Sequence, residues 1–206
     1  AGKQVVVTAG ATSEPIDPVR VITNRASGTT GRAVARACYV RGADVVVVGD
    51  QDDVPYAEVR RVETVEEMLE AVIPATDGAD ALVSTAAISD YTVDASDEKI
   101  RSGQALTLDL EPTPKVIDEV RSERPDLAIV GFKLETSGDD DAMVAAAREA
   151  AERTDLAFVV ANDAAVMGDT DTRALLVDAD DVAEYAGDKD GLGETVADRV
   201  ADLLAD

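Results

Sequence analysis

Hydrophobic residues gather in short continuous runs along this chain. KQVVVTA (3–9), ADVVVVGD (43–50) and ADALVST (79–85) are such runs, and DLAIVGFKLET (126–136) and DLAFVVAND (155–163) resemble them. A continuous apolar run is typical of a strand that is buried on both faces, as strands of parallel sheets are. The pattern therefore predicts at least five strands of one mostly parallel sheet.

The segments between these runs show the spacing of amphipathic helices. GRAVARACYVRG (31–42) ends at a glycine, and TVEEMLEAVIPA (64–75) begins with the Thr and Glu spacing of a capping box. We predict further helices over 113–124, with Thr113 as cap and Pro114 at the first helical position, over 139–154, and over 191–206. Strands that alternate with helices predict an α/β fold, a Rossmann-like sheet with helices on both faces. The length of the chain, 206 residues, fits a single domain over 1–206.

Three segments depart from the simple alternation. AEVRRVE (57–63) predicts an additional strand, and ALLVDADDVAEYA (174–186) predicts a hairpin. QALTLDLEP (104–112) alternates between apolar and polar residues, which indicates a half-exposed strand, and the preceding residues 86–103 show no regular period.

Charge and composition exclude several classes of function. The chain has 43 acidic and 19 basic residues and a net charge of −24, so we expect no nucleic-acid partner. It has no histidine, which excludes Ser-His-Asp triads and histidine-based metal sites. Its one cysteine, Cys38, excludes an internal disulfide and, at helical spacing from Val34, reads as a buried apolar residue.

The acidic residues are spread along the chain rather than gathered in one tail, whereas lysine is scarce and arginine more frequent. Because concentrated salt screens repulsion between like charges, we interpret the charge as adaptation to a salt-rich, halophilic cytosol. Residues 1–30 show no secretory signal, and no run of about 18 apolar residues predicts a membrane span. We therefore expect a cytoplasmic protein.

The first predicted strand and the first predicted helix are joined by a long segment with phosphate-binding features. Gly10 follows the strand where backbone must approach a ligand, and ASGTTGR places Ser27 as cap with Gly28 and Gly31 beside it. The free amides and positive dipole end of a helix N-terminus suit phosphate. The insert EPIDPVRVITN is rich in proline and apolar residues, so we expect an ordered lid or wall that aims Arg20 and Asn24 at a cleft.

Three other segments follow predicted strands and carry unusual residues: TAAISDY, GFKLET and VANDAA. Because ligands of open parallel sheets bind beyond the carboxyl ends of the strands, these segments and TAGATSEP predict one site. Lys99, one of only five lysines, lies in the irregular segment 86–103, nine residues after Asp90 in the sequence. Asp90 is a candidate ligand for Mg²⁺ bridged to phosphate.

A nicotinamide-dependent reductase is the obvious alternative. It requires G-x-G-x-x-G directly after the first strand, which is missing here. The short-chain type also requires Tyr-x-x-x-Lys on a helix, and the only such pair, Tyr185 and Lys189, falls between a predicted strand and the last helix.

Five pieces of the chain together resemble the phosphopantothenate–cysteine ligase family of coenzyme A biosynthesis. They occur in the family's order and are VTAGATSEPIDPVRVITNRASGTTG, STAAISDYTVDASDEKIRSG, LEPTPKVI, VGFKLET and DLAFVVANDA. The resemblance implies that the carboxylate of 4′-phosphopantothenate attacks the α-phosphate of CTP, which releases diphosphate. L-Cysteine then attacks the acyl-cytidylate through its amine and expels CMP, leaving 4′-phosphopantothenoyl-L-cysteine.

The resemblance also implies roles for individual residues. Lys99 would assist the first half-reaction, Asn24 would hold the acyl group for the second, and Arg20 would belong to the active site. Residues implied in nucleotide binding are Gly10, Ser27, Gly28, Ser84, Thr85, Ala86, Ala87, Asp90, Pro114, Lys115, Val116, Ile117, Phe132 and Arg148.

Two departures from the family's bacterial pattern concern the choice of nucleotide. Of two lysines expected on the helix before DLAFVVAND, one is replaced by Arg148 and the other by Glu152, and Lys133 stands where a small residue is usual. ATP therefore stays open as an alternative to CTP.

The family further implies a homodimer in which the 104–110 strand crosses to the partner, and often a fused or separate decarboxylase. Besides the ligase and the reductase, a nucleotide-binding module without catalytic activity remains as a third interpretation of the sequence.

Overall fold

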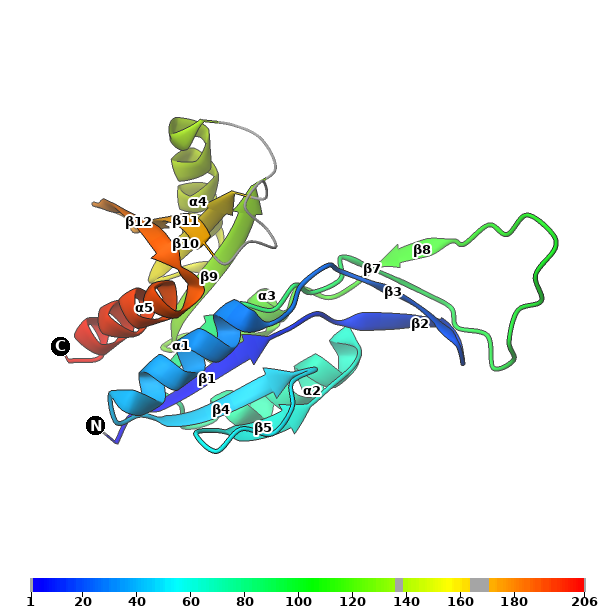
Figure 1. Cartoon of the computed structure of the whole chain (residues 1–206), viewed down its shortest axis with the longest axis horizontal. Helices are drawn as coiled ribbons and strands as arrows, with labels where there is room; N and C mark the ends of the chain where they lie inside the picture. The colour runs from blue at the N-terminus through cyan, green and yellow to red at the C-terminus, as the bar shows by residue number, and fades with distance from the viewer. Residues whose placement is uncertain (1, 136–138, 164–170, 206) are drawn as a thin grey trace.

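The computed structural model describes residues 2–135, 139–163 and 171–205. Its centre is an eight-stranded sheet in the order β12-β11-β10-β9-β6-β1-β4-β5 (Figure 1). Six neighbouring strands run parallel: β5, β4, β1, β6, β9 and β10. At the other edge, β11 pairs antiparallel with β10 and with β12, so that β11 and β12 form a hairpin. The strands are β1 (Gln4–Ala9), β4 (Asp44–Gly49), β5 (Glu58–Arg61), β6 (Ala81–Ser84), β9 (Ala128–Glu135), β10 (Phe158–Asp163), β11 (Asp171–Val177) and β12 (Val182–Asp188). The predicted α/β fold is confirmed, as is the hairpin.

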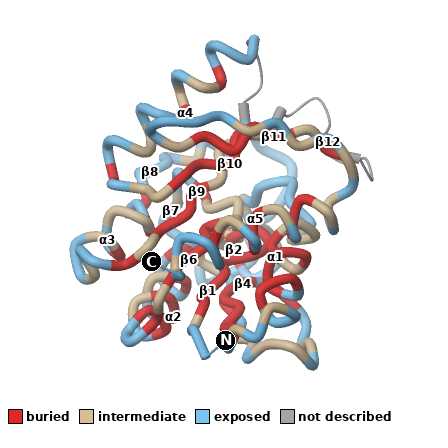
Figure 2. The backbone as a smooth tube through the Cα atoms, turned by 90° about the vertical axis from the view of Figure 1, so that its left-hand side faces the viewer, coloured by how far each residue is buried: buried red, intermediate tan, exposed pale blue. Residues whose placement is uncertain are grey.

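Five helices cover the two faces of this sheet. They are α1 (Thr29–Val40), α2 (Val65–Thr76), α3 (Val116–Glu123), α4 (Asp140–Thr154) and α5 (Lys189–Leu203). Alternate residues of one strand enter different cores: Val7 packs with residues of α1 and α5, whereas Val6 packs with residues of α2 and α3. Figure 2 shows the buried residues concentrated on the inner strands and on the helix faces toward them. Burial on both faces explains the continuous apolar runs.

Helices α1 and α5 approach each other closely at a glycine. A Cβ atom added at Gly193 of α5 would lie 2.6 Å from the carbonyl carbon of Ala33 on α1. Backbone cannot move aside as a flexible side chain can, so this contact limits residue 193 to glycine.

We therefore expect Gly193→Ala to lower the free energy of unfolding by roughly 1–3 kcal/mol, the usual cost of overpacking. Urea denaturation measures the change. Glu194→Ala, at an exposed position of the same helix, is the control and should change stability by less than about 0.5 kcal/mol. Equal stability of the two variants would show that the helices can separate at no cost.

The helix starts differ from the prediction at two places. The capping box of α2 is confirmed, with Thr64 accepting from the amide of Glu67 at 3.1 Å. Helix α1, however, is capped by Gly28 in a left-handed conformation, and Ser27 makes no cap bond. Helix α3 begins at Val116 with Lys115 as N-cap. The Thr113 hydroxyl instead donates to the carbonyl of Ser89 at 2.5 Å, so it joins two loops rather than capping a helix.

Four short strands form an arm that projects from the body (Figure 1). β2 (Ser13–Asp17) pairs with β3 (Arg20–Thr23), and β7 (Tyr91–Val93) pairs with β8 (Leu110–Pro112), both antiparallel. The insert is therefore ordered, as expected, but is a projecting hairpin rather than a wall. The strand predicted over 104–112 is wrong in extent, because only its last three residues pair.

Cys38 is buried at 3 % exposure, as its spacing predicts, and burial raises the pKa of its thiol to about 11. The thiol is therefore protonated and unreactive at neutral pH. Across the part of the chain that the structure describes, the helices are too short or too polar to cross a bilayer.

Candidate nucleotide-binding cleft

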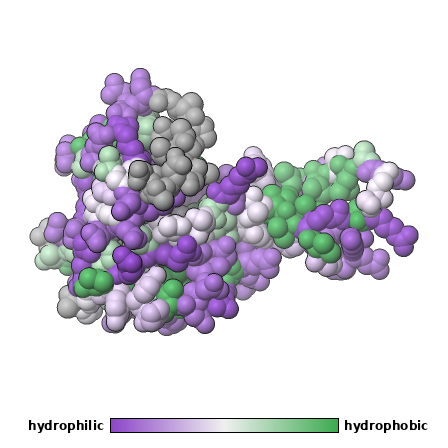
Figure 3. Space-filling model, in the orientation of Figure 1, coloured by the Kyte–Doolittle hydropathy of each residue, from purple (hydrophilic) through white to green (hydrophobic). Residues whose placement is uncertain are grey.

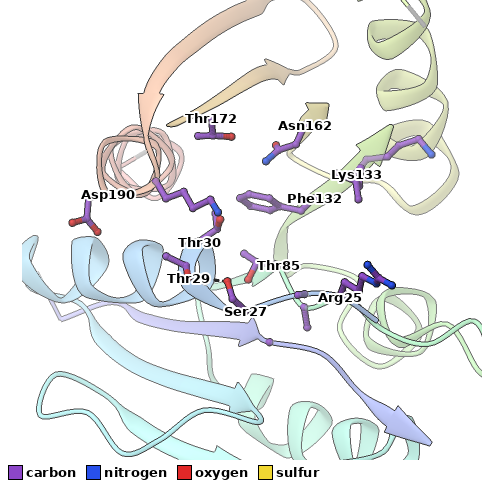
Figure 4. Close-up of a pocket in the computed structure, with 18 of the residues that line it drawn as sticks. Arg25, Ser27, Thr29, Thr30, Thr85, Phe132, Lys133, Asn162, Thr172 and Asp190 are labelled. Carbon is purple, nitrogen blue, oxygen red and sulfur yellow. Dashed lines mark hydrogen bonds between the residues drawn. The ribbon is translucent and has the colours of Figure 1, made fainter. Parts of the chain in front are cut away.

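A cleft of about 1030 Å³ lies at the carboxyl ends of β1, β6, β9 and β10, as Figure 4 shows. The chain runs outward from β1 to β4 and β5 on one side, and then from β6 to β9 and β10 on the other, so the strand order reverses between β1 and β6. Ligands of open α/β sheets bind at such a switch point. The lining consists of Gly10, residues 25–31, 85–87 and 132–134, Asn162, Thr172 and residues 188–190.

The N-terminus of α1 forms one wall of the cleft and is open to an anion. Gly28 has φ 68°, and no side chain of the described residues caps the first amides. The first turn of α1 has no acidic residue, whereas those of α2 to α5 each carry at least one. Arg25 also lines this wall and adds positive charge. The free amides and the helix dipole together favour a phosphate group here.

Gln51, which no sequence motif indicates, lies against the loops at Gly10 and Gly28. Cβ atoms added at Gly10 and Gly28 would lie 2.5 Å and 2.4 Å from its amide nitrogen. Gln51 is itself buried; it donates to Asp50 at 2.5 Å and accepts from Arg32 of α1. It therefore joins the end of β4 to the start of α1, and the positive φ of Gly10 (90°) and Gly28 (68°) favours glycine at both positions.

The floor of the cleft is held by bonds between the ends of β1 and β6. The Thr85 hydroxyl donates to the carbonyl of Thr8 at 2.5 Å, and the amide of Ala87 donates to the carbonyl of Gly10 at 2.9 Å. The Asn24 side chain then donates to the carbonyl of Ala87 at 3.1 Å. Asn24 does not line the cleft itself, but this bond fixes it beside residues that do.

The opposite wall carries an aromatic ring and an unused acceptor. Figure 4 shows the Phe132 ring between Asn162 and Thr30, with the Lys133 side chain directed away from the ring toward α4. Oδ1 of Asn162 is buried and finds no hydrogen-bond donor among the described residues. A buried acceptor without a donor is costly, so this atom suits an N–H group of a ligand. The sequence pattern indicates the segment VANDAA but not Asn162 in particular, and the last two residues of that segment, Ala164 and Ala165, lie outside the described residues.

The remaining predicted residues divide into those in the cleft and those outside it. Gly10, Ser27, Gly28, Thr85, Ala86, Ala87 and Phe132 line the cleft. Ser84 is buried beneath it, its hydroxyl 3.5 Å from that of Thr8. Arg148 is exposed on α4 and does not line the cleft. Thr29, Thr30, Thr172 and residues 188–190 are lining residues that no strand-end argument indicated.

Arg20 and Lys99 lie on the arm and do not line the cleft of their own chain. The Arg20 guanidinium pairs with Asp17 and donates to the carbonyl of Ile100 at 2.6 Å. Lys99 is exposed, and its side chain makes no hydrogen bond or ion pair with the described residues.

Asp90 forms an ion pair with Lys115, and both side chains are exposed. They lie outside the cleft lining, together with Pro114, Val116 and Ile117. The described residues contain no cluster of three acidic or cysteine side chains that could hold a resident metal ion. A single carboxylate fits Mg²⁺ only when phosphate oxygens complete the coordination, so the ion would have to arrive with a nucleotide.

The Tyr185 and Lys189 pair does not form a reductase site. Tyr185 lies on β12 and donates to the carbonyl of Asp188 at 2.8 Å, whereas Lys189 is the first residue of α5. The two residues therefore do not share a helix face, which removes the remaining sequence support for a short-chain reductase.

Fold and cleft define a Rossmann-like α/β protein with an uncapped helix start in a cleft at the switch point of its sheet. Residues 1–204 match the model of the DNA/pantothenate metabolism flavoprotein C-terminal domain, and the chain belongs to that family.

Individual relatives and solved structures support the same family. The chain is 46 % identical, over 87 % of its length, to the coenzyme A biosynthesis bifunctional protein CoaBC of Thermococcus kodakarensis, of which it covers 46 %. It superposes on the crystal structure of the C-terminal domain of a CoaBC protein with a TM-score of 0.82 at 26 % identity, covering 99 % and 96 % of the two chains. The DNA/pantothenate metabolism flavoprotein of Streptococcus pneumoniae has the same fold, with a TM-score of 0.87 at 24 % identity and coverage of 98 % and 100 %. The chain spans about half the length of the curated relatives it matches.

Proposed function

We propose that this chain is a phosphopantothenate–cysteine ligase that uses CTP in coenzyme A biosynthesis. The observation that carries the proposal is the uncapped, acid-free N-terminus of α1 in a cleft at the switch point of the sheet. It supports binding of a nucleotide triphosphate against a background charge of −24. Membership of a family whose relatives are named for coenzyme A biosynthesis supports the substrates.

The proposed reaction has two steps. A carboxylate oxygen of 4′-phosphopantothenate bonds to the α-phosphorus of CTP as the bond to the β-phosphate breaks, and diphosphate leaves. The cysteine amine then bonds to the acyl carbon, the bond to CMP breaks, and the amine loses a proton to solvent. Both steps develop charge on phosphate or carbonyl oxygens, so they need positioning and fixed positive groups more than a histidine base.

The residues of the cleft supply these groups in the proposed mechanism. The amides at the start of α1 bind phosphates, and Asn24, fixed on Ala87, orients the acyl group. Lys99 stabilises charge on the α-phosphate, with Arg20 beside it on the arm. Mg²⁺ bound to the nucleotide would neutralise phosphate charge, and Asp90 offers it one carboxylate.

Asn162 supports binding of a nucleotide base that carries an amino group, but it does not distinguish cytosine from adenine. Its buried oxygen can accept from the exocyclic amine of cytosine or of adenine, because both bases carry one. ATP is therefore the alternative co-substrate.

An assay with 4′-phosphopantothenate, L-cysteine and Mg²⁺, run with CTP and separately with ATP, tests the proposal. We expect diphosphate release that requires phosphopantothenate, and product formation that also requires cysteine. Nucleotide binding without diphosphate release would favour a module without catalytic activity. Nicotinamide oxidation would favour a reductase instead.

We further propose that the arm joins two copies of the chain into a homodimer. Large apolar side chains are exposed on it: Val19 at 64 %, Leu106 at 53 % and Leu110 at 47 %. Figure 3 shows an apolar surface covering much of the arm, in contrast to the polar body. A contiguous apolar surface on a polar protein is typical of an interface. Dimerisation would also bring Lys99 on the arm of one copy to the other copy of the chain.

We also propose a decarboxylase, fused or separate, as a second partner in coenzyme A biosynthesis.

Val19→Asp should therefore convert a dimer into a monomer in sedimentation equilibrium at high salt. Val40→Asp, at an apolar position on α1 that is 74 % exposed, is the control and should leave the mass unchanged. A wild-type chain that sediments as an active monomer would contradict the dimer.

The net charge gives a prediction about salt. With 43 acids against 19 bases, we expect the free energy of unfolding to increase from about 0.1 M to 2 M KCl, because the Debye length falls from roughly 10 Å to below 3 Å. Thermal unfolding followed by circular dichroism at several KCl concentrations measures this. A melting temperature independent of KCl would contradict adaptation to salt.

A further inference from the structure

Two carboxylates are buried on β2, although the strand belongs to the projecting arm. Glu14 is 5 % exposed and Asp17 is 3 % exposed. Glu14 accepts from the amide of Val65 at the start of α2 and from the hydroxyl of Thr92 on β7, both at 2.9 Å. Glu14 therefore connects the root of the arm to the body.

Asp17 connects the tip of the same hairpin to the segment that carries Lys99. Its Oδ1 atom accepts from the amides of Val19 and Arg20, both at 2.9 Å. Its Oδ2 atom accepts from Nε of Arg20 at 2.9 Å and from the amide of Ile100 at 3.0 Å. One oxygen thus closes the local turn, and the other binds a segment more than eighty residues away.

The backbone of Ile100 is held on both sides. Its amide donates to Asp17, and its carbonyl accepts from Nη2 of Arg20 at 2.6 Å. A second bond, from the amide of Ser96 to the carbonyl of Ile16 at 2.9 Å, holds the start of the same segment. The side-chain hydrogen bonds of Arg20 lower the pKa of Asp17, so the carboxylate is ionised at any working pH.

Lys99 has no side-chain contact of its own that could fix its place. It is exposed and makes no hydrogen bond or ion pair with the described residues. Its position therefore follows from its backbone, which is anchored at the next residue.

We propose that Asp17 is a positioning residue for Lys99, acting through the amide of Ile100 and the guanidinium of Arg20. The inference rests on the proposed function, in which Lys99 stabilises charge on the α-phosphate. Asp17 itself does not touch the nucleotide in this account; it keeps the 96–100 segment against the hairpin, so that the lysine enters the reaction from a fixed backbone.

Asp17→Asn removes the acceptor role of one side-chain oxygen of residue 17 and keeps that of the other. The asparagine oxygen can still accept from Val19 and Arg20, so the turn is kept. Its NH₂ group would face the Ile100 amide and the Arg20 guanidinium, which are donors, so the long-range bond to Ile100 and the ion pair with Arg20 are lost. Asp140→Asn, which breaks an exposed ion pair with Arg173 far from the arm, is the matched control.

We expect Asp17→Asn to slow phosphopantothenate-dependent diphosphate release by roughly a hundredfold, the cost of a catalytic group displaced by about 1 Å. The KM for the nucleotide should change little, and Asp140→Asn should react at the wild-type rate. The melting temperature of Asp17→Asn should fall, because Arg20 loses its buried partner, so the rates are compared at a temperature where circular dichroism shows both variants folded. Combined with Lys99→Gln, Asp17→Asn should cause no further loss, because both changes remove the same group. The proposal would be overturned if the double variant were slower than Lys99→Gln by the factor that Asp17→Asn alone causes. It would also be overturned if Asp17→Asn reacted at the wild-type rate.

Amide hydrogen exchange distinguishes this failure from failure of the proposed function. Asp17→Asn should speed exchange at Ile100 at least tenfold while leaving Val19 and Arg20 unchanged, whether or not the chain ligates. If exchange changes as expected but neither the wild type nor any variant releases diphosphate, the proposed function fails and the positioning role fails with it. If the wild type is active and Ile100 exchange is unchanged, the positioning role alone is overturned.

Discussion

Replacing Lys99 by Gln should lower the rate of diphosphate release by about 10²–10³-fold, the loss typical for one group that stabilises transition-state charge. The change removes a positive charge and keeps most of the side chain. Lys99 is exposed and makes no hydrogen bond or ion pair with the described residues, so the fold loses no contact. We therefore expect an unchanged melting temperature and nucleotide affinity beside the lost rate. Rapid-quench measurement of diphosphate release, with saturating phosphopantothenate and no cysteine, isolates this step.

Lys3→Gln is the control for this experiment. Lys3 forms a surface ion pair with Asp80 at 3.0 Å, outside both the cleft and the arm. The same chemical change there should leave the rate at the wild-type value. Diphosphate release by Lys99→Gln at the rate of this control would remove Lys99 from the reaction.

Replacing Asn24 by Asp acts on the second step instead. The amide group of Asn24 donates to the carbonyl of Ala87 at 3.1 Å, and a carboxylate cannot donate. Aspartate would place two acceptors together and add negative charge where the amine attacks the acyl carbon. We expect acyl-cytidylate to form and accumulate while transfer to cysteine falls by about 10²-fold or more. Chromatography of acid-quenched mixtures identifies the intermediate.

Gln4→Glu makes the same amide-to-carboxylate change at the start of β1, at the opposite end of the strand from the cleft, and should transfer normally. An Asn24→Asp variant that fails to form acyl-cytidylate at all would assign Asn24 to the first step. One that forms product at the control rate would remove it from the site.

The sheet could be predicted from the sequence because its strands are buried on both faces. Val5, Val6 and Val7 are all at or below 2 % exposure, so the pattern has no polar interruption to confuse with a helix. The capping box at Thr64 was equally predictable, because both of its bonds are local.

Features that depend on neighbouring segments could not be predicted in this way. Ser27 has the chemistry of a cap, but its hydroxyl faces that of Thr29 at 2.8 Å, and the left-handed Gly28 takes its place. Thr113 is recruited by the carbonyl of Ser89, which only the folded chain brings near. The alternation over 104–112 indicated a strand, yet only residues 110–112 find a partner in β7.

The cleft was predictable to the extent that it is built from strand ends. The ends of β1, β6 and β9 contribute Gly10, Thr85 and Phe132 to it, as convergence of parallel strands requires. Gln51 and Thr172 reach the loop at Gly10 and the opposite wall through the tertiary fold, and no local motif marks them. Lys99 depends on the arm, whose course the sequence did not indicate.

A crystal structure of the chain with CTP and Mg²⁺ tests the central claim most directly. The account predicts the triphosphate at the amides of residues 28–31, between Gly10 and Arg25, with the base on the side of Phe132 and Asn162. A nucleotide bound outside this cleft, or a cleft that stays empty at saturating CTP while the chain is active, would contradict it.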